Sequence, residues 1–186
     1  TPSLADNRLV LGGCDGFLHF VSPVSGNLIN KFELADYIAG SPVMKDGLAV
    51  VGDYNGGVSC VDYYNNKLLW TYSNPDNQLP IISSPAVHEQ RVIVTSRDKH
   101  VYCLDLRTGK VLWKKNTGFK IDASPLMTDN GVLVVNMRGD MYFLNTESGK
   151  EIWKYELGIP VVSNPALYKG KIIVAATDGN IYCLGK

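Results

Sequence analysis

The sequence predicts an all-β protein made of repeated four-stranded antiparallel sheets. A dipeptide of Ser, Thr or Asn followed by Pro recurs at intervals of 40, 43, 40 and 40 residues: Thr1-Pro2, Ser41-Pro42, Ser84-Pro85, Ser124-Pro125 and Asn164-Pro165. After each dipeptide come a β-rich run, a turn and an aromatic-apolar run, and after the first four a second turn leads into another strand. A fixed period near 40 residues in an all-β pattern is typical of a β-propeller, in which each repeat forms one blade.

The third repeat shows the elements of a blade in order. Four strand-forming runs, rich in β-branched and aromatic residues, are separated by polar turns: 85–87, 91–95, 100–105 and 111–114. The apolar runs are nearly continuous, as in Val92-Ile93-Val94, rather than alternating. Because continuous runs indicate strands buried on both faces, we expect each blade to be stacked between two others.

The other repeats place the same residue types at the same positions. The third-strand position holds Phe20, Cys60, Cys103, Phe143 and Cys183, and the fourth-strand position holds Asn30, Trp70, Trp113 and Trp153. We interpret the recurring residues as structural, with the tryptophans packing between blades. The predicted structural positions of the repeat are Trp70, Trp113, Trp153, Gly109, Gly149, Pro42, Pro85, Pro125 and Pro165.

We expect residues 1–186 to form a single partial propeller domain. Its repeats are predicted at about 1–40, 41–83, 84–123, 124–163 and 164–186, which gives about 4.75 blades. One interpretation is the C-terminal segment of a seven- or eight-bladed ring, and the alternative is a closed ring of five blades with one incomplete sheet. In the first case the last strand offers an unpaired edge and both terminal blades expose apolar faces. We then expect the missing blades, a protein partner or self-association to cover them.

The composition excludes several classes of partner. Lys plus Arg and Asp plus Glu balance at 18 each and no basic stripe is visible, so we expect no nucleic acid. No apolar stretch reaches the 18 residues that suggest a membrane-spanning helix, so we predict no membrane-spanning segment.

The sequence shows no catalytic constellation and no metal site. The four cysteines lie on separate repeats without a Cys-x-x-Cys or paired His motif, so we expect free thiols, buried at 60, 103 and 183 and accessible at Cys14. The three histidines look isolated, and Arg138-Gly139-Asp140 falls in a hairpin turn.

Asp36 and Asp122 precede first strands, near one mouth of the channel, and are the only carboxylates we propose to test as cofactor ligands.

Residues 98–113 (DKHVYCLDLRTGKVLW) and 138–153 (RGDMYFLNTESGKEIW) resemble the repeat of the PQQ-binding-like, or quinoprotein, β-propellers. The first repeat departs from that pattern, since Asn30 stands where Trp is expected. The resemblance implies three functions that stay open: a non-catalytic scaffold, part of a dehydrogenase that oxidises alcohols or sugars with PQQ and calcium, or a repeat domain fused to a cytoplasmic adenylating enzyme. It favours an extracytoplasmic or periplasmic location and leaves a cytoplasmic one open.

The sequence favours the scaffold, because every prominent residue has a role in the repeat and no catalytic set remains. The dehydrogenases of the family use a catalytic Asp and usually a disulfide between adjacent cysteines, whereas this sequence has no adjacent cysteines and no acidic cluster outside turn positions. We therefore predict a platform for protein partners without a cofactor, and we expect PQQ and calcium only if the chain is part of a dehydrogenase.

Overall fold

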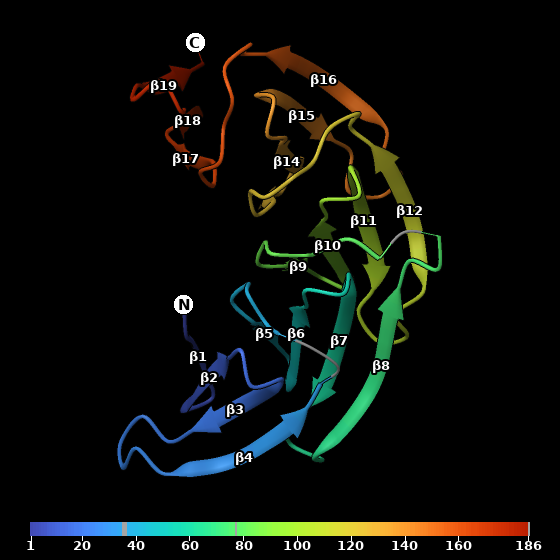
Figure 1. The fold of residues 1–186 in the computed structure, drawn as a ribbon, viewed down its shortest axis with the longest axis vertical. Coiled ribbons are helices and arrows are strands. Elements are labelled where there is room, and N and C mark those ends of the chain that lie inside the picture. The colour runs from blue at the N-terminus through green and yellow to red at the C-terminus, as the bar shows by residue number, and fades with distance from the viewer. Residues whose placement is uncertain (35–36, 77, 186) are drawn as a thin grey trace.

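The computed structural model describes residues 1–34, 37–76 and 78–185, which form five antiparallel sheets and contain no helix. The sheets stand side by side along an arc, with the two chain ends at opposite ends of it (Figure 1). In the part of the chain that is described, no helix is long and apolar enough to cross a membrane.

Each of the first four sheets contains four strands that are consecutive in sequence and neighbours in space. Blades 1 and 2 consist of β1 (Ser3–Ala5), β2 (Arg8–Gly12), β3 (Phe17–Val21), β4 (Leu28–Glu33), β5 (Val43–Lys45), β6 (Leu48–Gly52), β7 (Gly57–Asp62) and β8 (Lys67–Ser73). Blades 3 and 4 consist of β9 (Ala86–His88), β10 (Arg91–Thr95), β11 (His100–Asp105), β12 (Val111–Asn116), β13 (Leu126–Thr128), β14 (Gly131–Val135), β15 (Asp140–Leu144) and β16 (Glu151–Glu156). Blade 5 has three described strands, β17 (Ala166–Tyr168), β18 (Lys171–Ala175) and β19 (Ile181–Leu184).

The predicted all-β propeller of four-stranded antiparallel blades is confirmed. In blade 3, the strand β9 begins at Ala86 rather than at Pro85, because proline has no N–H to donate to a neighbouring strand. Strand β12 continues to Asn116, two residues beyond the expected end, since Lys115 and Asn116 still pair with Val101 and His100.

The repeat positions coincide residue by residue in the strand register. Between the third and fourth strands, the paired residues are Phe20 and Asn30, Cys60 and Trp70, Cys103 and Trp113, and Phe143 and Trp153. A register shift follows directly after each of these pairs. Such a bulge bends a strand and increases its twist, so all four blades twist at the same place.

The core lies between the blades rather than inside any one of them. Four clusters of buried apolar side chains each join two consecutive blades. Every residue of β6 and of β14 is buried, which agrees with the continuous apolar runs of the sequence. The first strands line the inside of the arc, where β1 contacts β5, β5 contacts β9 and β9 contacts β13. The fourth strands β4, β8, β12 and β16 form its outside (Figure 1).

Candidate functional site: the loop face of the propeller

The carboxylates of the hairpin aspartates accept hydrogen bonds from the backbone of their own turns. The carboxylate of Asp53 accepts the N–H groups of Asn55 at 2.9 Å and Gly57 at 2.7 Å. In blade 3, the buried Asp98 accepts the N–H of His100 at 3.0 Å, and it also accepts hydrogen bonds from the Tyr102 hydroxyl and the side-chain amide of Asn74. These carboxylates fix the turns that connect second and third strands, and they have a structural role.

Of the two carboxylates that the sequence singled out, Asp122 lies within the described residues. Asp36 lies outside the described residues. Asp122 accepts two hydrogen bonds from Arg97, from Nε and from a terminal nitrogen, both at 2.8 Å. This bidentate pair raises the pKa of Arg97 and joins the hairpin of blade 3 to the loop that enters blade 4.

The described residues do not fit PQQ with calcium. Calcium takes six to eight oxygen ligands, whereas both oxygens of Asp122 already accept hydrogen bonds from Arg97. Among residues 1–34, 37–76 and 78–185, no three His, Cys, Asp or Glu side chains are close enough together to hold a metal ion.

Two tryptophans connect neighbouring blades through the turn of the next blade. The indole N–H of Trp70 donates to the carbonyl of Leu106 at 3.0 Å, and a Cβ on Gly109 would lie 2.6 Å from the indole ring. One blade further, the indole N–H of Trp113 donates to the carbonyl of Thr146 at 2.8 Å, and a Cβ on Gly149 would also lie 2.6 Å from the ring. Each Trp therefore needs a glycine in the next blade.

Blade 1 replaces both halves of this contact. The side-chain amide of Asn30 donates to the side-chain oxygen of Asn66 at 2.5 Å. Asn66 occupies the position of Gly109 and Gly149 and shares their positive φ. Where the Trp is absent, the glycine is absent too, and a polar pair joins the blades instead.

The proline dipeptides form a second connection, along the inside of the arc. The N–H of Ser41 donates to the Ser84 hydroxyl at 2.9 Å, the N–H of Ser84 to the Ser124 hydroxyl at 3.0 Å, and the N–H of Ser124 to the Asn164 side chain at 2.7 Å. A proline restricts the residue before it to extended conformations, which holds each acceptor in place. The recurring Pro42, Pro85, Pro125 and Pro165 thus follow the residues that tie one blade to the next. The sequence shows the recurrence but not this hydrogen bonding.

The expectation that the histidines are isolated is wrong for two of them. His19 Nε2 lies 2.7 Å from Asp15, and this hydrogen bond is the main cause of the lowered pKa of that carboxyl. His100 contacts the carbonyl of Asp98 through Nδ1 at 3.0 Å. Both rings lie near hairpin aspartates, because the third strand begins directly after the turn.

All four cysteines are free, as expected, but Cys183 is exposed rather than buried. Its position in β19 corresponds to Cys60 and Cys103, which a neighbouring blade covers, while no described residues cover blade 5 on its far side. Burial raises the pKa of the Cys60 and Cys103 thiols to about 12.

We therefore expect two kinetic classes of thiol at pH 8, because only a thiolate reacts rapidly. Titration with a chromogenic disulfide should modify Cys14 and Cys183 quickly, and all four thiols only after denaturation. A total below four, or four equally fast thiols in the native protein, would contradict this assignment.

The loops that connect blades are fixed to the hairpins at one face of the propeller. Four hydrogen bonds repeat the same 17-residue separation, from the N–H of Tyr54, Arg97, Met137 and Thr177 to the carbonyls of Tyr37, Pro80, Lys120 and Pro160, at 2.8–3.1 Å. Each connecting loop thus lies against the hairpin of the next blade. We call the surface formed by these loops and hairpins the loop face.

The loop face carries exposed apolar side chains on this rigid backbone. Tyr37, Tyr54, Leu79 and Phe119 are 38–55% exposed. A hollow of about 430 Å³ between blades 1 and 2 is lined by Tyr37, Tyr54, Ile38, Ala39 and Cys14. Exposed aromatic side chains held by a rigid scaffold are typical of protein interfaces. Leu79 and Phe119 share one loop position 40 residues apart, a recurrence that could have identified this surface from the sequence.

A family model described as outer membrane protein assembly factor BamB matches residues 1–119 and 97–185. The BamB of Yersinia pestis is 27% identical over 139 residues, which cover 66% of this chain and 35% of that protein. A 1-butanol dehydrogenase (cytochrome c) of Thauera butanivorans is 32% identical over 91 residues, 43% of this chain and 13% of that enzyme. The chain thus spans about a third or less of these curated relatives.

Among solved structures, the crystal structure of BamB from Moraxella catarrhalis superposes with a TM-score of 0.86 at 17% identity. The superposition covers 98% of this chain and 60% of that protein, and at this identity it shows the fold alone. The family model matches nearly the whole chain, and the structure shows the repeated four-stranded blades of a propeller. The two findings agree on the family. The chain belongs to the PQQ-like repeat family whose model is described as outer membrane protein assembly factor BamB.

Proposed function

We propose that this chain is a non-catalytic propeller segment that binds a protein partner through its loop face. The observation that carries the proposal is the contrast between two kinds of residue. The hairpin aspartates stabilise turns, Trp70 and Trp113 bind the next blade, and the serines before the prolines join one blade to the next. The apolar side chains Tyr54, Leu79 and Phe119 are exposed on loops and hairpins that hydrogen bonds hold in place.

The family suggests the class of partner. Relatives named outer membrane protein assembly factor act, by that name, in the assembly of other proteins. We propose that this chain likewise supports assembly of an outer-membrane protein, as a platform rather than as a catalyst. An extracytoplasmic location is part of this proposal.

Site-specific photo-crosslinking in the cells that make the protein tests this function. A benzophenone amino acid at Phe119 should cross-link to one discrete protein. The matched control is Ile152, which is 52% exposed but lies on the outer strand β16. Equal cross-linking from Phe119 and Ile152, or none from Phe119, would argue against the loop face as the interface.

A second candidate function rests on the identity to the 1-butanol dehydrogenase. Part of a quinoprotein dehydrogenase should reduce a dye with alcohols or sugars after addition of PQQ and calcium. We expect no such activity, because the carboxylates of Asp53 and Asp98 are engaged in hairpin turns and that of Asp122 in an ion pair. Substrate-dependent dye reduction would favour the dehydrogenase instead.

A further inference from the structure

Three cations meet on the loop face at the junction of blades 3 and 4. The loop that connects these blades is held between two hairpins. The N–H of Thr117 donates to the carbonyl of Lys99 at 2.9 Å, and the N–H of Met137 donates to the carbonyl of Lys120 at 2.8 Å. Arg138 follows directly after Met137. We call the three cations and the aromatic residue in the middle of the loop the basic patch: Lys99, Lys120, Arg138 and Phe119.

All three cations depart from the repeat. The position of Lys99 holds glycine in every other blade: Gly16, Gly56, Gly139 and Gly179. The position of Arg138 holds aspartate or asparagine in the others: Asp15, Asn55, Asp98 and Asp178. The position of Lys120 holds an uncharged residue in the equivalent loops: Tyr37, Pro80 and Pro160. Because the fold sets the repeat residues, three replacements by cations at one junction indicate a function of that junction.

Lys99 keeps the backbone conformation of the glycine that it replaces. Its φ is 76°, close to the 77° of Gly16 and the 78° of Gly56. This left-handed conformation is unfavourable for a residue with a side chain and is easily adopted by glycine. The fold alone therefore favours glycine at this position, and we attribute the lysine to recognition rather than to folding.

The cations of the basic patch are available to a partner. Lys99, Lys120 and Arg138 are all exposed. Among the described residues, neither lysine ammonium has a hydrogen-bond or ion-pair partner. Arg138 lies 3.1 Å from the carboxylate of Asp140, and 61% of its side chain is still exposed.

The carboxylates on the same hairpins and loop are buried or paired. Asp98 and Asp140 are only 4% and 3% exposed. Asp122 is engaged by the guanidinium of Arg97. The surface at this junction is therefore positive, although Lys plus Arg and Asp plus Glu balance at 18 each over the whole chain.

Hydrogen bonds also fix the loop that carries Phe119. The side-chain oxygen of Asn116 accepts the N–H of Gly118 at 2.7 Å. The hydroxyl of Thr117 lies 3.0 Å from the carbonyl of Phe119 and 3.1 Å from that of Lys99. Phe119 is 42% exposed on this ordered backbone. Because the surface is ordered before a partner arrives, binding costs less conformational entropy.

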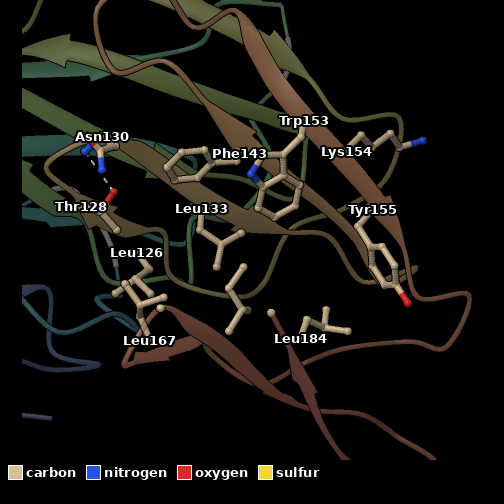
Figure 2. A pocket seen from close by; sticks show the side chains of 13 residues that line it. Leu126, Thr128, Asn130, Leu133, Phe143, Trp153, Lys154, Tyr155, Leu167 and Leu184 are labelled. Atoms are coloured by element: carbon tan, nitrogen blue, oxygen red, sulfur yellow. Dashed lines mark hydrogen bonds between the residues drawn. The ribbon is translucent and has the colours of Figure 1, made fainter.

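The apolar groove between blades 4 and 5 lacks such a charge pattern. It has a volume of about 570 Å³, and Figure 2 shows Leu126, Leu133 and Phe143 among its apolar side chains. Of the described residues that line it, only Lys154 is charged. Selection of a charged partner therefore belongs to the basic patch and not to this groove.

We propose that the basic patch binds an acidic segment of the protein partner. Carboxylates of the segment pair with Lys99, Lys120 and Arg138, and an apolar side chain of the segment packs against Phe119. Such charge complementarity selects the partner and speeds its association. A nucleic acid needs a longer row of cations along its phosphates, and a lipid surface needs a wider apolar face. This inference rests on the function proposed above and specifies the chemistry of the partner.

The identity of the captured segment provides the first test. A benzophenone amino acid at Phe119 is cross-linked in the cells that make the protein, and mass spectrometry locates the attachment site. We expect a protein segment with more acidic than basic residues. A neutral or basic segment would overturn this inference and leave the proposed function standing. A cross-link to lipid or nucleic acid, or none at all, would overturn both.

Charge variants measure the contribution of the basic patch. Lys99→Gly combined with Lys120→Glu should lower the cross-link yield about fivefold or more, since two attractive charges are lost and a repulsive one is added. The control combines Lys67→Gln and Lys114→Glu on the outer strands β8 and β12, changes the charge by the same amount and should leave the yield unchanged (Figure 1). An unchanged yield in the patch variant, or equal losses in both variants, would overturn the inference.

Lys99→Gly alone separates recognition from folding. Glycine restores the residue of the other blades, so the melting temperature should equal or exceed that of the parent chain. The cross-link yield should nevertheless fall, whereas Lys99→Arg should preserve it. A full yield with Lys99→Gly would show that this lysine serves no recognition and would overturn the assignment.

Discussion

Replacing Trp113 with alanine is expected to lower the free energy of unfolding by about 3–5 kcal/mol, the usual cost of removing a large buried aromatic side chain. Trp113 is 8% exposed, belongs to the cluster between blades 3 and 4, and donates to the carbonyl of Thr146. The substitution leaves a cavity and an unpaired carbonyl at a blade junction. Chemical denaturation followed by circular dichroism measures the change.

Asn30 provides the internal control for this prediction. It stands at the same strand position in blade 1, where a hydrogen bond to Asn66 replaces the Trp contact. Asn30→Ala should lower the free energy of unfolding by about 1 kcal/mol, as for one partly exposed hydrogen bond. A loss below about 1 kcal/mol for Trp113→Ala would mean that the indole does not join the blades.

Gly149→Ala is expected to destabilise the protein by about 2–5 kcal/mol. An alanine there must adopt a positive φ, which costs about 1–2 kcal/mol, and its Cβ must displace the indole of Trp113, which adds about 1–3 kcal/mol. The measurement is again the midpoint and slope of chemical unfolding.

Gly26→Ala is the matched substitution. Gly26 lies at the same position in blade 1 and has a φ of 73°, close to the 66° of Gly149, but no atom lies within 4 Å of the Cβ it would carry. This variant should show the cost of the backbone alone, about 1–2 kcal/mol. Equal losses for Gly26→Ala and Gly149→Ala would show that the contact with Trp113 contributes nothing.

The recurrence of short motifs made the fold predictable. The proline dipeptides and the recurring fourth-strand tryptophans predicted the blades and the order of their strands. They recur because each repeat must fill the same space between two neighbours. The partners of those residues were harder to predict. Asn66 pairs with Asn30 across a junction, and the sequence gives no sign that the two positions meet until the blades are stacked.

The candidate site was less predictable than the fold. Asp122 looked available in the sequence, and only the structure shows that the Arg97 guanidinium occupies both of its oxygens. Phe119 and Leu79 were not among the residues singled out from the sequence, since their exposure depends on how the connecting loops lie against the hairpins. Burial of Cys183 was wrongly expected, because the prediction gave blade 5 the same neighbours as the inner blades.

The central claim is that the loop face, and not the repeat residues, recognises a partner. The most direct test is the cross-link formed by a benzophenone amino acid at Tyr54, measured in the parent chain and in the Leu79→Ser, Phe119→Ser double variant. Both substituted side chains are exposed, so the melting temperature should stay the same. We predict that the cross-link is lost in the double variant. A cross-link of full yield in the folded double variant would contradict the claim.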